Sequence, residues 1–225
     1  MIEADNVWYS YSERAILKGA SLSIGNGITV LVGPNGAGKT TLLKVMAGIY
    51  RLDSGRIFID GEDLWACPPS HRVELRRKVV YVHEKPIILR GSVFFNVCYG
   101  LMLRNLDRKE VQKKALEIME KLGIKALAWK NARELSAGQA QLMVLARALA
   151  VKPKYLLLDE PLANLDKKNR ELVLRLLEEL KDRGVGIAVA THDRLLALRI
   201  ADKIALIEEG CIVVEGPPEK LKDYL

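Results

Sequence analysis

One stretch of the sequence decides how this chain folds: Gly33-Pro34-Asn35-Gly36-Ala37-Gly38-Lys39-Thr40. An apolar run at residues 28–32 precedes it, and residues 41–47, which begin with Thr41, have the composition of a helix. The pattern G-x-x-x-x-G-K-T requires this order of strand, loop and helix. Its glycines leave space for backbone N–H groups to turn towards an anion, and the helix start adds its positive dipole end. The stretch therefore predicts a loop that binds phosphate.

Two side chains of this loop suit a nucleoside triphosphate. We expect Lys39 to reach the β- and γ-phosphates and Thr40 to place its hydroxyl on Mg²⁺. The alternative is a glycine-rich turn that binds nothing. The full eight-residue match, in its strand and helix context, disfavours that alternative.

The composition is typical of a globular chain. Its 225 residues are 49% hydrophobic, enough for one well-buried domain with a smaller lobe. No apolar run approaches the ~20 residues that span a bilayer, and the acidic start at residues 1–5 lacks the pattern of a signal peptide. The three cysteines are widely spaced, which disfavours a metal site or a disulfide framework. We therefore expect a soluble, cytoplasmic protein.

The net charge of +7 and the pI of about 9.3 admit three explanations. These are nucleic-acid binding, docking at an anionic membrane face, and a surface rich in Lys and Glu. The charges are spread along the predicted helices and are not gathered in one block. The third explanation is therefore the default, and no nucleic-acid partner is expected.

Strand and helix patterns alternate along most of the chain. Strands are expected at residues 2–9, 15–24, 56–61, 79–83, 155–158 and 187–190, helices at 70–78, 107–122, 167–183 and 193–201, and a hairpin at 203–215. Continuous apolar strands such as residues 155–158 are typical of parallel sheets covered on both faces. Between Glu84 and Glu134 strand patterns disappear. We interpret residues 85–134 as a helical insertion in an otherwise α/β domain.

An acidic pair ends the apolar strand at residues 155–158. Asp159 could hold Mg²⁺ opposite the phosphate loop, directly or through water. Glu160 could orient or activate an attacking water. The alternative is an acidic strand end in solvent, which the phosphate loop earlier in the chain disfavours.

A second helix with glycine near its start follows Leu135-Ser136-Ala137-Gly138-Gln139. Ser136 and Gln139 fit a capping box, which is a purely structural interpretation. The same helix start is also a possible anion site, useful if it faces a nucleotide bound to another subunit. His192 follows the strand at residues 187–190. A histidine at a strand end is usually structural, but in an open parallel sheet this edge lines the ligand crevice.

Together these residues resemble the ATP-binding cassette, the nucleotide-binding subunit of ABC transporters, over nearly the whole chain. The resemblance implies a P-loop NTPase core with a mostly parallel sheet, an N-terminal antiparallel β subdomain and a helical insertion. It implies one domain over residues 1–225, with residues 1–84 and 135–225 forming the RecA-like core and residues 85–134 the helical subdomain.

The resemblance also assigns roles to single residues. Residues 135–139 match the family's signature sequence, with Ala137 where glycine is commoner, and Ser136, Ala137, Gly138 and Gln139 would bind nucleotide. Asn164-Leu165-Asp166 corresponds to the loop that crosses the dimer interface. His192 matches the switch histidine, and Tyr11, with Tyr9 second, the aromatic residue that stacks on adenine. A head-to-tail dimer would enclose two ATP molecules, each between one subunit's Gly33 loop and the other's Ser136 helix, with Glu160 as general base.

One position departs from the family pattern. The glutamine usual after the third core strand, a Mg²⁺ ligand, is replaced by Glu84. A glutamate can also ligate Mg²⁺, but it adds a negative charge. Its role as a metal ligand is implied by the resemblance alone.

The resemblance implies an ATPase subunit of a membrane transporter, with ATP and Mg²⁺ as ligands. Its partners would be transmembrane permease subunits, a second copy of itself and an extracellular solute-binding protein, and it would lie at the cytoplasmic side of the membrane. Phe94, Phe95 and Tyr99 are candidate permease contacts, or ordinary core. Residues 85–97 resemble oxyanion importers of tungstate or phosphate. The alternative is a non-transport cassette acting on DNA or the ribosome, but the long coiled coils or double cassettes of such proteins are lacking.

Overall fold

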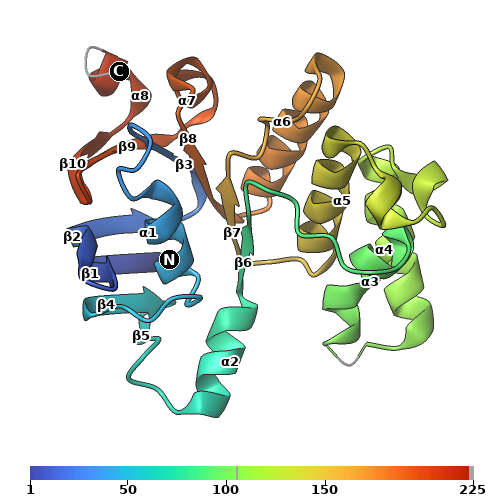
Figure 1. Ribbon diagram of the computed structural model, residues 1–225, viewed down its shortest axis with the longest axis horizontal. Helices are drawn as coiled ribbons and strands as arrows, with labels where there is room; N and C mark the ends of the chain where they lie inside the picture. Colours follow the sequence, from blue (N-terminus) through green and yellow to red (C-terminus); the bar gives the residue numbers. More distant parts are fainter. Residues whose placement is uncertain (105, 223–225) are drawn as a thin grey trace. The chain divides into compact units, whose positions relative to one another are not determined.

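The computed structural model describes residues 1–104 and 106–222, which form two compact units (Figure 1). The first unit comprises Met1–Tyr81, Lys154–Glu160 and Leu177–Leu225. The second comprises Val82–Pro153 and Pro161–Leu176. Among residues 1–104 and 106–222, no helix combines the length and the apolarity that crossing a bilayer requires.

The N-terminal part of the first unit is an antiparallel sheet with the strand order β2-β1-β4-β5. Its strands are β1 (Ile2–Tyr11), β2 (Arg14–Ile24), β4 (Ser54–Ile59) and β5 (Glu62–Asp63). The turn between β1 and β2 places Ser12 at φ 54°. The antiparallel pairing of these four strands confirms the predicted N-terminal antiparallel β subdomain.

The second sheet of this unit has the order β10-β9-β3-β8-β7-β6. Its strands are β3 (Gly27–Val32), β6 (Val79–Val82), β7 (Tyr155–Asp159), β8 (Gly186–Thr191), β9 (Lys203–Glu208) and β10 (Cys211–Gly216). Strand β3 pairs in parallel with β8 and β9, and β7 pairs in parallel with β8. Every residue of β3, β7 and β8 is buried, as expected for parallel strands with both faces covered. Only the predicted hairpin, β9 with β10, is antiparallel among the pairings described in this sheet.

Short helices complete the first unit. They are α1 (Lys39–Met46), α2 (Pro69–Arg77), α7 (Arg194–Ile200) and α8 (Pro218–Leu221). Helix α1 buries Leu42, Leu43 and Met46 in a core that also holds Ile2 and Ile57 from the antiparallel sheet. The phosphate-loop helix is therefore packed against the N-terminal subdomain. Helix α7 starts after Asp193, whose side chain accepts from the Leu196 N–H at 2.9 Å and caps it.

Helices dominate the second unit. They are α3 (Val93–Met102), α4 (Arg108–Lys121), α5 (Ala137–Ala150) and the first part of α6 (Lys167–Asp182), with short 3₁₀ turns at Lys125–Leu127 and Ala132–Glu134. Helices α3, α4 and α5 contact one another. Helix α4, within the helix predicted at residues 107–122, buries Val111, Ala115 and Met119.

This helical unit is larger than the insertion expected at residues 85–134. Helix α5 joins it because it packs on α3 and α4, contacts that a reading of the chain in order does not reveal. The division into a core of residues 1–84 and 135–225 with an insertion at 85–134 stays a prediction.

Candidate functional site

The phosphate loop ends at a helix start without a side-chain cap. Gly38 occupies the N-cap position of α1 at φ 109°, and the helix begins with the bond from the Leu42 N–H to the Gly38 carbonyl at 2.8 Å. The first N–H groups of any helix have no partner within the helix. An anion satisfies such groups and interacts favourably with the helix dipole.

Glycine is required in this loop for two reasons. A Cβ on Gly33 would lie 2.2 Å from the Ile207 carbonyl oxygen, so the loop can pass β9 only without a side chain. Gly36 has a φ of 83°, where other residues are strained, and a Cβ there would meet open space. Pro34, Asn35 and Gly36 are exposed, whereas Ala37 to Lys39 are buried. The first part of the loop is thus exposed to solvent, and the part that leads into α1 is buried.

The Lys39 ammonium lies inside this loop. Its Nζ donates to the carbonyl oxygens of Gly33 at 2.6 Å and Pro34 at 3.0 Å, and the residue is 8% exposed. Burial lowers the pKa of Lys39, while the carboxylates of Glu160 and Asp159 act in the opposite direction. A cation bound by carbonyl oxygens at an uncapped helix start fits a phosphate ligand.

Thr40 and Asp159 meet at the end of β7. The Thr40 hydroxyl donates to Asp159 Oδ2 at 2.7 Å, and the Tyr81 hydroxyl donates to the same oxygen at 2.9 Å. Asp159 is only 2% exposed. Within the part of the chain that the structure describes, no three His, Cys, Asp or Glu side chains are grouped to hold a metal. One carboxylate and one hydroxyl suit Mg²⁺, which is usually bound by few protein oxygens together with substrate phosphates.

Glu160 is held by the residues that follow β8. Its Oε2 accepts from the Thr191 hydroxyl at 3.0 Å, and its Oε1 accepts from the His192 N–H at 2.9 Å. The His192 Nδ1 also lies 2.6 Å from Oε1. Glu160 has a φ of 45°, a conformation that costs a non-glycine residue about 1–3 kcal/mol. This backbone is fixed by the bond from the Glu160 N–H to the Ala190 carbonyl at 2.9 Å.

Sequence reasoning missed Tyr81 and Thr191. Both belong to strands of the sheet that carries Asp159 and Glu160. Their signal in the sequence is weak, because each is only a residue with a hydroxyl group within an apolar run or at its end. Only the strand order β8-β7-β6 places their hydroxyls next to the two acids.

Tyr11, the predicted adenine contact, is the last residue of β1 and is 43% exposed. Its ring lies in a cluster with Tyr9 and Tyr50, with centroids 5.0 and 5.7 Å away. Its hydroxyl is hydrogen-bonded to Thr41 of α1. Tyr11 is thus connected directly to the helix of the phosphate loop.

The signature residues lie in the second unit. Ser136 and Gln139 form the predicted capping box, with Gln139 N–H to Ser136 Oγ at 3.3 Å and Ser136 N–H to Gln139 Oε1 at 3.2 Å. Ser136 and Ala137 are exposed. A Cβ on Gly138 would lie 2.9 Å from the Asn164 carbonyl oxygen, so the signature helix approaches the segment that ends at Asp166.

Asp166 and Glu84 are also in this unit. Asp166 caps α6, because its carboxylate accepts from the Asn169 N–H at 2.8 Å and from Asn169 Nδ2 at 3.1 Å. Glu84 is exposed and follows β6. The nucleotide contact of Asp166 and the metal contact of Glu84 stay predictions.

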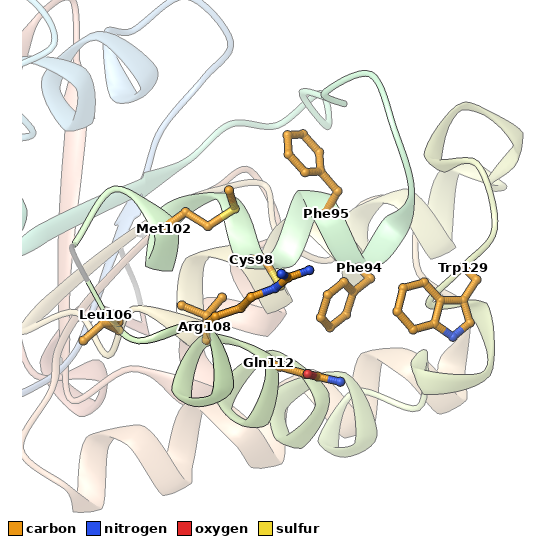
Figure 2. Close-up of a pocket in the computed structure, with 9 residues that line it drawn as sticks. Phe94, Phe95, Cys98, Met102, Leu106, Arg108, Gln112 and Trp129 are labelled. Carbon is orange, nitrogen blue, oxygen red and sulfur yellow. The ribbon is translucent and has the colours of Figure 1, made fainter.

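An aromatic pocket of about 610 Å³ lies between α3 and α4 in the second unit (Figure 2). It is lined by Phe94, Phe95, Cys98, Met102, Leu106, Arg108, Val111, Gln112 and Trp129. Trp129 is 74% exposed and its ring lies 5.0 Å from that of Phe94. Phe95 and Tyr99 are 37% and 40% exposed, which rules out ordinary core for both.

Comparison with known proteins agrees with this geometry. Residues 17–163 match the family model described as ABC transporter. The chain is 36% identical over 225 residues to the phosphate import ATP-binding protein PstB 2 of Natronomonas pharaonis, which covers 96% of this chain and 79% of the relative. It is 38% identical over 211 residues to the tungstate uptake system ATP-binding protein TupC of Peptoclostridium acidaminophilum, covering 93% and 95%.

Solved structures show the same fold. The dimeric structure of MJ0796, a bacterial ABC transporter cassette, superposes with a TM-score of 0.87 at 27% identity, covering 97% of this chain and 99% of the other. The uncapped phosphate loop, the strand-end acids and these matches lead to one conclusion. The chain belongs to the ABC transporter family, as an importer-like nucleotide-binding subunit with ATPase activity.

Proposed function

We propose that this chain hydrolyses MgATP to drive a membrane importer, as one half of a head-to-tail dimer. The observation that supports it most is the arrangement of Lys39, Thr40 and Asp159 around the uncapped start of α1. A triphosphate would supply the anion that this helix start lacks. Bound Mg²⁺ would neutralise charge on the phosphate oxygens, with Thr40 and Asp159 as its protein ligands.

Glu160 is proposed as the general base. Its carboxylate is oriented by Thr191 and by the backbone and ring of His192, so that it can accept a proton from a water molecule. The His192 side chain is 67% exposed and Glu160 17%. His192 can therefore contact both the base and a phosphate brought to this edge of the sheet.

Dimerisation would complete the site. The Ser136 hydroxyl accepts a bond from the Gln139 N–H, but its own O–H can still donate. We propose that Ser136, Gly138 and Gln139 bind the nucleotide held by the phosphate loop of the partner. Asp166 would lie near the same interface.

The aromatic pocket of the helical unit would receive a permease subunit. Exposed Trp129, Phe95 and Met102 offer apolar area, and Arg108 offers a charge for an acidic residue of the permease segment. In this proposal the subunit would lie at the cytoplasmic side of the membrane, with a solute-binding protein outside. An inorganic oxyanion is the proposed cargo, because the relatives compared above are named for phosphate import and tungstate uptake.

Replacing Glu160 with Gln tests the central step. The carboxamide preserves the shape of the side chain but cannot act as the base, so turnover should fall by about 10²–10⁴-fold. MgATP should still bind, and an ATP-dependent dimer should accumulate because ligand is shared by two subunits. Size exclusion with MgATP and a phosphate-release assay measure both.

Asp182→Asn is the control, since this carboxylate ends α6 and has no role assigned in the proposed site. It should dimerise and turn over as the wild type does. Wild-type turnover in Glu160→Gln would remove Glu160 from the role of base.

A further inference from the structure

Three tyrosines form a cluster beside the phosphate-loop helix. Tyr9 and Tyr50 are stacked, with centroids 5.3 Å apart and an interplanar angle of 9°. Tyr11 is nearly perpendicular to both, at 90° and 83°. Such edge contacts are preferred by aromatic rings and fix their relative orientation. The ring of Tyr11 is therefore oriented by the other two.

The cluster also has a polar side. The Tyr11 hydroxyl is hydrogen-bonded to the side chains of Thr41 and Tyr50. Lys44 is hydrogen-bonded to Tyr50, and its Nζ lies 5.4 Å from the centre of that ring. Thr41 and Lys44 are both residues of α1. The hydrogen bonds thus begin and end on the helix that starts at the phosphate loop.

Exposure differs among the three rings. Tyr11 is 43% exposed, whereas Tyr9 and Tyr50 are half-buried. Tyr11 is consequently the ring available to a ligand, and the Tyr50 ring packs edge-on against it with centroids 5.7 Å apart. Burial and the bond to Tyr50 raise the pKa of Tyr11 to about 12, so its hydroxyl remains a donor at neutral pH.

We propose that Tyr50, together with Lys44, is a positioning residue of the nucleotide site that holds the Tyr11 ring for the base. The inference rests on the proposed function as an ATP-binding subunit and on the prediction that Tyr11 stacks on adenine. Tyr50 acts through Tyr11 and needs no contact with the nucleotide. Its contribution therefore concerns the base and not the phosphates.

The test compares two ligands on each variant by calorimetry. MgATP uses the base and the phosphates, whereas magnesium tripolyphosphate uses the phosphate loop alone. Tyr50→Ala should weaken MgATP binding by up to about tenfold, the upper range for losing aromatic pairs. Its affinity for tripolyphosphate should stay within about twofold of wild type, because hydrogen bonds at the loop are preserved. Tyr11→Ala should show the same selective loss.

Tyr50→Phe preserves the ring and protects the test against a folding defect. It should retain most of the MgATP affinity and remove one tyrosine ionisation from an absorbance titration at 295 nm. That ionisation belongs to Tyr50, whose pKa is lowered by its bonds to Tyr11 and Lys44 despite burial. Trp8→Phe is the control, an aromatic residue of β1 that is 42% exposed and outside the cluster. It should change neither affinity.

Two results would overturn the inference. If Tyr11→Ala loses MgATP affinity and Tyr50→Ala does not, Tyr50 does not position Tyr11. If Tyr50→Ala weakens both ligands equally, its role is structural. A wild-type protein that binds neither ligand would instead overturn the proposed function, and the inference with it.

Discussion

Two helices of this protein begin at glycine-containing motifs, and they begin differently. Helix α1 follows Gly38 without a side-chain cap, whereas α5 starts with the capping box of Ser136 and Gln139. Uncapped N–H groups favour an external anion, and capped ones are already partly satisfied. The phosphate loop is therefore ready to bind phosphate within one subunit. The start of the signature helix is capped within its own chain, so it can add donors only when a ligand is brought to it.

The surroundings of the two helices reinforce this contrast. Near α1, the hydroxyls of Thr40 and Tyr81 both donate to the carboxylate of Asp159. At α5, Gly138 faces the Asn164 carbonyl, and Gln141 is fully buried with its Nε2 donating to the Pro161 carbonyl at 3.3 Å. The signature helix is thus connected to residues 161–166, the segment expected at the dimer interface. The difference suggests that binding begins at α1 and is completed by α5 of the partner.

The largest expected effect is on MgATP binding by the monomer, which should depend on the start of α1 and not on the start of α5. Lys39→Ala removes the charge-assisted bonds to the phosphates and should weaken MgATP binding by about 100-fold or more. Ser136→Ala should bind MgATP as a monomer but lose turnover, because Ser136 is proposed to act only in the dimer. Equilibrium binding at dilute protein, with phosphate release at high concentration, measures both. Equal loss of monomer binding in the two variants would contradict the contrast.

Mixed dimers test whether the signature acts across the interface. Lys39→Ala and Ser136→Arg are each expected to be inactive alone, because each lesion damages both sites of a symmetric dimer. In a mixed dimer both lesions fall in one site and the other is intact. An equal mixture should regain about a quarter of wild-type turnover, since half of the dimers are mixed and each has one working site. A mixture without regained activity would exclude the head-to-tail arrangement.

Much of this contrast was predictable because it depends on local sequence. The loop at Gly33–Thr40 and the box at Ser136 are short patterns, and the buried run at 155–158 has few alternatives to a parallel strand. Contacts between distant segments were not predictable. Tyr81 reaches Asp159, and Thr191 reaches Glu160, only through the strand order of the sheet. Strand β5 and helix α8 were missed because two and four residues are too short for periodicity.

Replacing Gly38 at the start of α1 and Gly138 at the start of α5 by alanine compares how much each backbone conformation contributes to the free energy of unfolding. Gly38→Ala should destabilise the protein by about 1–2 kcal/mol, because its left-handed φ of 109° is strained for alanine. Gly138 has an ordinary helical conformation, so the better helix propensity of alanine, about 1 kcal/mol, offsets part of its contact with Asn164. Urea unfolding measures both. A larger loss for Gly138→Ala would mean that the contact of α5 with residues 161–166 dominates.

The smallest expected effect concerns Glu84, the residue that departs from the family pattern. If it ligates Mg²⁺, its carboxylate adds negative charge beside Asp159, Glu160 and the ATP phosphates, a repulsion that only the metal offsets. The ratio of the affinity for MgATP to the affinity for metal-free ATP should therefore be larger in the wild type than in Glu84→Gln. We expect a difference of about threefold, typical of one screened charge near the surface. Resting ATPase should rise on substitution, because the amide carries no charge.

Side-by-side titrations with MgATP and with ATP in EDTA measure this ratio on both proteins. Glu134→Gln, another exposed glutamate of the helical unit, is the matched control for a lost surface charge. It should leave the Mg²⁺ dependence as it is in the wild type. An equal dependence in wild type and Glu84→Gln would mean that Glu84 lies outside the reach of the metal. Thr40 and Asp159 would then be the only proposed protein ligands of the metal, without Glu84 of the helical unit. The start of α1 would bind both phosphate and metal, and the start of α5 would add only donors from the partner.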